Sequence, residues 1–329
     1  MALLAMVLAG CVSSLLDGCP PDCLEANFKE RDLTGMGLKD ANLRNADLSQ
    51  AILIEADLRN ADLSNADLSE ADLSKANLSG ARLTGANLIK ADLSEAVIDD
   101  AILSGADFTG AILTRVDLRK VDLSAVILDE AQLMGANLWG VQLRGTTLVG
   151  ADLRSAILVA TDLSGANLGV DDVKTESPTI LIGADMRGAR LIGANLDRAN
   201  LNGVNLSRAH LNGASLISAK LRGADLSLAV LSDATLNDAQ LNGANLQYAE
   251  LVKARLFRAL LTGANVQGAD FRHASFGVEP ATRDPKTSPL LDLSGVHYDQ
   301  EAVWPVGFLP PESAKLLEER EQEEEEQDE

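Results

Sequence analysis

The apolar residues of this chain follow a five-residue period. From Ala26 to Leu168, and again from Leu181 to Phe276, a large apolar residue, usually Leu, occupies every fifth position. Ala usually stands two residues before it, Asp or Asn lies between the two, and a pair of polar or small residues follows. No face of an α-helix has this spacing. The pattern therefore predicts a repeat structure with one short extended element in each pentapeptide.

We number the positions of each pentapeptide 1 to 5, so that Ala is position 1, Asp or Asn position 2 and Leu position 3. Successive side chains of an extended chain point to opposite faces, so positions 1 and 3 should point inward and position 2 into solvent. Positions 4 and 5 then turn the chain. Most of the 26 glycines stand at position 5, because glycine tolerates turn conformations that strain other residues. A coil with an interior of Ala and Leu is the expected result.

The run ADLRNADLSNADLSEADLSKANLSGARLTGANL at residues 56–88 resembles the pentapeptide-repeat family. The resemblance extends over residues 26–276. It implies an all-β fold, a right-handed quadrilateral β-helix in which four pentapeptides form each of about twelve coils. We therefore expect two arrays of repeats, at residues 26–168 and 180–277.

An inserted loop is predicted between the two arrays, at residues 169–179 (GVDDVKTESPT). Here 13 residues separate Leu168 from Leu181, which is not a multiple of five. Pro178 and its charged neighbours indicate a loop that leaves the coil at one corner. The loop is either a neutral insertion or a segment that binds a partner.

Several repeats carry Val or Thr at the inward position 1 in place of Ala. We interpret them as a locally wider coil, a feature of packing without a further role. These residues are Val116, Val121, Val126, Val141, Thr146, Thr161, Thr179 and Val204.

The C-terminal end of a β-helix exposes unpaired backbone groups and core residues that must be covered. Residues 278–311 are expected to hold a linker, degenerate repeats and a cap. Tyr298 falls at position 3 of a degenerate repeat, and Trp304 and Phe308 are bulky enough to close the end. The segment YDQEAVWPVGFLP resembles the C-terminal caps of pentapeptide-repeat proteins.

An acidic tail follows at residues 312–329. It is expected to begin as a helix after Pro311, with Leu316 and Leu317 on it, and to continue as a solvated acidic run.

Residues 1–25 are predicted to be a lipoprotein-type signal and leader. LAGC at residues 8–11 resembles the lipobox of bacterial lipoproteins, which implies lipidation of Cys11 and an anchor to a bacterial membrane that faces the periplasm or the outside. The apolar run from Ala2 to Ala9 is too short to span a bilayer. Since no Lys or Arg precedes it, the alternatives are a start farther upstream or a plain apolar leader.

Cys19 and Cys23 are the other two cysteines of the chain. In an oxidising compartment they would form a disulfide. The alternative is a pair of free thiols, because the loop that they would close is tight.

The net charge of −21 is distributed unevenly: −8 in residues 26–168, +3 in residues 180–277 and −8 in residues 312–329. No dense basic stripe with interleaved aromatic residues is present, so direct binding of nucleic acid is not expected. His210, His273 and His297 have no Cys or second His at the spacing of a metal site. We therefore expect no catalytic residues, cofactor, metal or small-molecule substrate, and a protein that is not an enzyme.

Two functions are consistent with these features. The first is a non-catalytic scaffold or protein-binding rod, lipid-anchored in the bacterial cell envelope, with a protein partner that the sequence does not name. The second follows from the family resemblance: some members mimic B-form DNA and bind DNA gyrase in the cytoplasm. The acidic first array fits the second function, whereas the positive second array and the lipobox favour the first.

Overall fold

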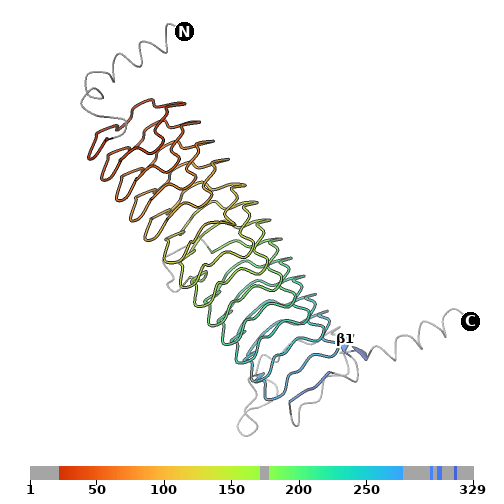
Figure 1. Cartoon of the computed structure of the whole chain (residues 1–329). Helices are drawn as coiled ribbons and strands as arrows, with labels where there is room; N and C mark the ends of the chain where they lie inside the picture. The colour runs from red at the N-terminus through yellow and green to blue at the C-terminus, as the bar shows by residue number, and fades with distance from the viewer. Residues whose placement is uncertain (1–21, 171–177, 277–296, 299–301, 306–314, 317–329) are drawn as a thin grey trace, which may run out of the picture. The chain divides into compact units, whose positions relative to one another are not determined.

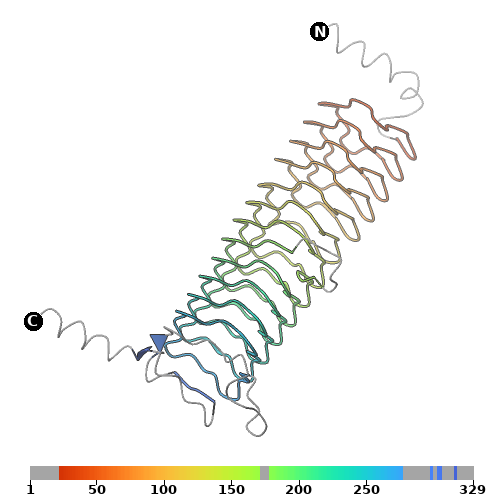
Figure 2. The ribbon, with the colours of Figure 1, turned by 180° about the vertical axis from the view of Figure 1, so that it is seen from behind.

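The computed structural model describes residues 22–170, 178–276, 297–298, 302–305 and 315–316 (Figure 1). It contains two compact units, Met1–Asp152 (unit 1) and Leu153–Glu329 (unit 2). Within each unit the chain winds through square coils that lie one above another, as the view from behind also shows (Figure 2). Each unit is a right-handed quadrilateral β-helix, as predicted.

Backbone hydrogen bonds between successive coils hold residues twenty positions apart in register. In unit 1 the N–H of Leu33 donates to the carbonyl of Ile52 at 2.7 Å, and the N–H of Asp47 donates to the carbonyl of Ala26 at 2.9 Å. The position-2 residues form the resulting parallel bridges, for example Asn27 with Asp47. One bridge for each side of the coil satisfies the backbone groups that would otherwise be buried without a partner.

The corners are tight turns that place position 5 in the left-handed region. The N–H of Arg31 donates to the carbonyl of Phe28 at 3.0 Å, and Glu30, the third residue of this turn, has φ of 58°. A turn of this kind requires positive φ at its third residue and is favoured by glycine. Gly80 and Gly85 occupy the same position with φ of 70° and 67°, so the predicted role of the position-5 glycines is confirmed.

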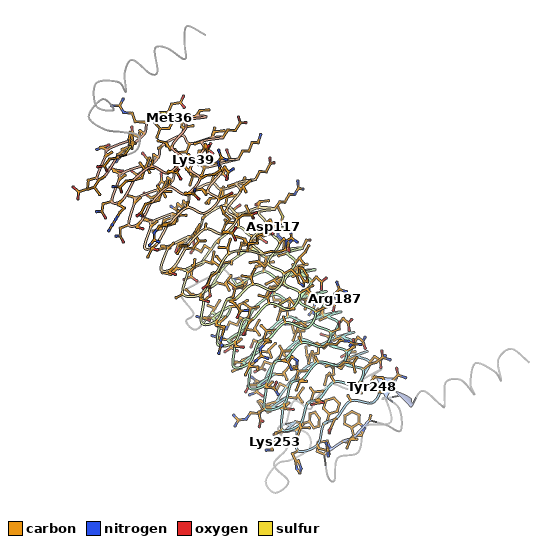
Figure 3. The ribbon with its side chains drawn as sticks, in the orientation of Figure 1. Met36, Lys39, Asp117, Arg187, Tyr248 and Lys253 are labelled. Atoms are coloured by element: carbon orange, nitrogen blue, oxygen red, sulfur yellow. The ribbon has the colours of Figure 1, made fainter. Side chains whose placement is uncertain are left out.

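The interior consists of Ala at position 1 and Leu at position 3. Ala61 and Leu63 are both 0% exposed, and nearly all of the corresponding residues in both units are buried. Large side chains point outward elsewhere: Lys39, Asp117 and Arg187 project from the coil surface in Figure 3. The predicted division into inward and outward positions is therefore correct.

The ladder of unit 1 is interrupted at two places that lie beside an inward Val. Within the described residues, Val97 does not bridge Asp117 and Asp122 does not bridge Gln142, although the bridges on neighbouring sides are present. At the first gap, Val116 directly precedes Asp117. At the second gap, Val121 precedes Asp122 and stacks on Val141, one coil away. We attribute the second gap to the stacked Val121 and Val141, whose added methyl groups need more room between coils than Ala does. Single Val residues at 126 and 204 leave the bridges beside them intact, and the wider coil itself stays a prediction.

The interior of unit 1 is filled beside this interruption by position-3 side chains from two adjacent coils. The space between them has no room for a water molecule. Its lining is formed by Ile98, Leu103, Phe108, Leu113, Leu118, Leu123 and Leu128.

In unit 2 the inserted segment lengthens one coil without breaking the ladder. Asn167 bridges Asn195, a separation of 28 residues, whereas Ile180 bridges Asn200 at the usual 20. The chain therefore has eight extra residues between Val170 and Thr179. Both of these residues are buried. Residues 171–177 lie outside the described part of the chain.

The coil of unit 1 extends farther toward the N-terminus than the sequence prediction, which began at Ala26. Asp22 bridges Asn42, and the N–H of Cys23 donates to the carbonyl of Asn42 at 2.8 Å. Cys23 takes position 3 and is buried. The pattern missed this repeat because Pro21 and Cys23 stand where Ala and Leu are usual.

Two short strands lie beyond the coils of unit 2 and contradict one prediction. Strand β1 (His297–Tyr298) pairs in parallel with β2 (Lys315–Leu316), with His297 opposite Lys315. The expected helix at Leu316 is therefore wrong, because this part of the chain pairs with a neighbouring strand. Among the described residues, no helix is long and apolar enough to cross a membrane.

Candidate functional site

The outward Asp and Asn side chains at position 2 have a structural role that the sequence did not reveal. The carboxylate of Asp47 accepts the N–H of Ser49 at 3.0 Å and its hydroxyl at 2.6 Å. The Asn77 side chain bonds Ser79 in the same way. Such bonds between residues i and i+2 stabilise the turn that follows. The prediction of a purely solvated face was therefore incomplete.

Where position 2 lacks Asp or Asn, a residue of the preceding coil can satisfy the same N–H. In unit 2, Asp197 Oδ1 accepts the N–H of Ile217 at 2.8 Å, and Asn202 Oδ1 accepts the N–H of Arg222 at 3.0 Å. Both acceptors stand at position 4. The signal in the sequence would have been an Asp or Asn at position 4 twenty residues before the unprotected N–H.

Arginine at position 4 forms an ion pair with the aspartate two residues before it. Arg59 Nε lies 2.7 Å from Asp57 Oδ1, and Nη2 lies 2.6 Å from Oδ2. This hydrogen bond from the guanidinium lowers the pKa of Asp57 to about 2. Arginines lower the pKa values of three further carboxyls by the same geometry, in the pairs Asp117–Arg119, Asp185–Arg187 and Asp270–Arg272. These carboxylates stay ionised at neutral pH and belong to the scaffold.

Large apolar side chains on the surface of unit 1 are scattered. Val97, Ile102 and Ile127 are exposed at position 2, but they belong to three different ladders, with Asn77, Arg82 and Asp107 as their partners. Trp139, 54% exposed, stands at a corner. Single exposed apolar residues are common on protein surfaces, whereas a contiguous patch would mark an interface.

The predicted cap residue Trp304 lies against the last aromatic side chains of the unit 2 interior. Val303 pairs with Asp270, and the N–H of Phe271 donates to the carbonyl of Val303 at 2.7 Å, which is the bond that a regular repeat makes at this place. Ala302, Val303 and Trp304 thus act as positions 1 to 3 of a further repeat. The indole stacks on Phe271 and contacts Phe276 at 6.5 Å between centroids.

The other predicted site residues are placed only in part. The backbone of Tyr298 lies in β1, whereas Phe308 lies outside the described residues. Cys23 is disulfide-bonded, but Cys19, its expected partner, and Cys11 lie outside the described residues. The pairing of Cys19 with Cys23 and the lipidation of Cys11 stay predictions.

Two of the three histidines lie within the repeats. His210 is a position-2 residue that bridges Arg190 and Val230, and His273 is at position 5 with φ of 60°. In the part of the chain that the structure describes, no group of three His, Cys, Asp or Glu side chains has the arrangement of a metal site.

The fold and its surface define a β-helical repeat protein with a displayed polar surface. The family model of pentapeptide repeats matches eight segments, some of them overlapping, that cover residues 22–169 and 179–277. The chain therefore belongs to the pentapeptide repeat family. No curated protein sequence matches it.

Solved structures with similarity to the chain include pentapeptide repeat proteins. HetL, a pentapeptide repeat protein involved in heterocyst differentiation regulation from the cyanobacterium Nostoc sp. strain PCC 7120, is 30% identical over 91% of this chain and 98% of HetL, with a TM-score of 0.21. A pentapeptide repeat protein of the Arabidopsis thaliana thylakoid lumen is 32% identical over 32% of this chain and 70% of its own, with a TM-score of 0.21.

QnrB1, a plasmid-mediated fluoroquinolone resistance protein, is 17% identical to the chain. The similarity covers 53% of this chain and 90% of QnrB1, with a TM-score of 0.36.

Proposed function

We propose that this protein is a non-catalytic scaffold that binds a protein partner through its outer surface and is anchored by lipid on Cys11 in a bacterial cell envelope. The observation that carries the scaffold role is the use of the outward polar groups. The Asp57 carboxylate and its counterparts bond the turn N–H or a neighbouring arginine. Such groups stabilise a rigid surface and hold their charge, whereas a general acid or base must exchange protons near neutral pH.

The anchor is proposed from the sequence alone. LAGC at residues 8–11 has the pattern of a lipobox. A single acyl chain holds a protein to a membrane only marginally, and stable attachment needs more than one. A lipidated Cys11 would carry the coil of unit 1, which is already formed at Asp22, close to the membrane surface.

Incorporation of labelled palmitate together with membrane fractionation tests the anchor. We expect the wild-type protein to be labelled and to sediment with membranes, and globomycin to block its processing. The Cys11→Ser variant should be unlabelled and soluble, with an unchanged far-UV spectrum because the described coil starts eleven residues later. Unlabelled wild-type protein in the cytoplasm would contradict the proposal.

The acidic first array supports a second candidate, binding to DNA gyrase as a mimic of DNA. Residues 26–168 carry a net charge of −8, which suits a surface that takes the place of a polyanion. Inhibition of purified gyrase in a supercoiling assay tests it. The Cys11→Ser variant should inhibit as well as the wild type, whereas an absence of inhibition at micromolar protein would exclude this function.

A further inference from the structure

Four exposed cations gather on two adjacent sides of unit 2. We call Arg198, Lys220, Arg222 and Arg255 the basic surface. Arg255 lies on the ladder of Asn195, Ser215 and Thr235, and Lys220 lies on the next ladder around the coil, between Asn200 and Gln240. Arg198 stands at the corner between the two ladders, and three coil steps of about 4.8 Å separate its repeat from that of Arg255.

The cations of the basic surface have no acidic partner within the described residues. None of the four is in an ion pair there, unlike Arg187 and Arg272 elsewhere in the unit. Two nearby carboxylates are engaged elsewhere: Asp238 pairs with Arg258 at 2.6 Å, and Asp197 accepts the hydroxyl of Ser215 and the N–H of Ile217. Asp233, at the corner before Thr235, is exposed and forms no ion pair with the four cations. The side that carries Lys220 has no acidic residue at position 2, where Asp is common in this protein.

Asparagine side chains of the preceding coil let Lys220 and Arg255 stand at position 2 without loss of a hydrogen bond in the following turn. An Asp at position 2 accepts a hydrogen bond from the backbone N–H two residues later, whereas the side chains of Lys220 and Arg255 cannot. Asn202 accepts the N–H of Arg222 instead, and Asn237 accepts that of Phe257 at 3.0 Å. The coil therefore keeps its hydrogen bonds while it concentrates positive charge.

We propose that the basic surface binds the acidic tail of the same chain. Residues 317–329 contain nine carboxylates and one arginine, a complement to four unpaired cations. The tail leaves β2 after Leu316, in the same unit. Its thirteen residues reach about 43 Å when extended, which exceeds the length of the basic surface several times over. Tethering also raises the effective concentration of the tail above that of a separate acidic segment.

Zero-length carbodiimide cross-linking of the full-length protein at low concentration, followed by mass spectrometry, tests the contact. Lys220 is the one lysine of the basic surface and should cross-link to glutamates of residues 318–329. Lys253 is the comparison lysine, because it is exposed, lies more than one coil nearer the C-terminal end and stands at the corner before Arg255, whereas Lys220 lies on the side beyond the Arg198 corner. Figure 3 marks Lys253 near the end of the coil. If only proximity to the tail mattered, Lys253 would cross-link to it more than Lys220. Docking on the basic surface should instead give Lys220 about fivefold or more of the cross-links. Salt at 0.5 M should remove this preference.

A triple variant that leaves Lys220 in place, Arg198→Asn, Arg222→Gln and Arg255→Gln, should lose the Lys220 preference while it keeps the far-UV spectrum of the wild type. Equal cross-linking of Lys220 and Lys253 in the wild type would overturn the proposal. Cross-links from Lys220 to the tail that occur only in covalent dimers would also overturn it and assign the surface to a second copy. Neither result depends on the lipid anchor, so this test and that of the proposed function can fail separately.

Discussion

The indole of Trp304 lies flat on the ring of Phe271, with ring centroids 5.0 Å apart and planes 4° apart. Phe271 is the position-3 residue of the repeat before that of Phe276 and is fully buried. Trp304 occupies the same position in the pairing that follows, since Val303 bonds Phe271 as a position-2 residue does. The cap thus continues the side-chain stack of the interior with a larger aromatic surface.

Replacement of Trp304 by Ala should expose Phe271 and destabilise the protein by about 3 kcal/mol, the range for loss of a large aromatic side chain from a packed site. Urea unfolding measures it. The control is Val303→Ala, because the Val303 side chain is exposed and its backbone bonds are kept. Equal stability of the two variants would show that the indole does not close the core.

Val121→Ala should restore the ladder between Asp122 and Gln142, because the smaller side chain lets the two coils approach. We expect slower hydrogen exchange of the amides at residues 122–125. The control is Val204→Ala in unit 2, where the ladder is intact and Asp225 N–H already bonds the Val204 carbonyl at 2.9 Å. There the substitution should leave a small cavity and give no added protection. Faster exchange in Val121→Ala would contradict the proposed cause of the interruption.

Deletion of Asp171–Pro178 removes the eight extra residues and should leave a folded, β-rich protein. Val170 then precedes Thr179 directly and must adopt positive φ at position 5, which is unfavourable for a β-branched residue. The added change Val170→Gly should therefore raise stability by about 1 kcal/mol. Thermal unfolding followed by circular dichroism measures both.

The control for this deletion is removal of Asp171–Ser177, which keeps Pro178 and one residue too many. The single extra residue must bulge from a corner that normally has two residues, so this variant should be less stable. Identical melting of the two deletion variants would mean that this corner accepts one extra residue without cost.

The ion pair between Arg59 and Asp57 should make a pH-dependent contribution to stability. The folded protein holds the pKa of Asp57 at about 2, below the value of about 3.9 in an unfolded chain. The contribution is therefore complete above about pH 4 and is lost as the pH falls toward 2. Because both side chains are exposed to solvent, screening keeps this contribution small.

Arg59→Gln removes the guanidinium and should lower the free energy of unfolding at pH 6 by this small amount, with no difference from wild type near pH 2. Lys75→Gln, at an exposed position 5, is the control. Its difference from wild type in the free energy of unfolding should be the same at both pH values. A difference for Arg59→Gln that persists undiminished at pH 2 would show that packing of the arginine stem, and not the ion pair, is responsible.

The sequence by itself determined the coil and the direction of its side chains. A five-residue period with Ala and Leu at positions 1 and 3 has one economical solution, in which these residues are enclosed, and Ala61 and Leu63 are buried as expected. Repetition makes this inference safe, since each pentapeptide meets nearly the same neighbours in the coils before and after it.

Only the tertiary structure decided which residues meet across coils. Three features each involve residues at least twenty positions apart in the chain: the acceptance of the Arg222 N–H by Asn202, the missing bridge between Val97 and Asp117, and the stack of Trp304 on Phe271. The expected helix at Leu316 failed for the same reason, because its partner, Tyr298, lies in another segment. Local pattern sets which face a side chain occupies, whereas the contacts between faces depend on how the coils stack.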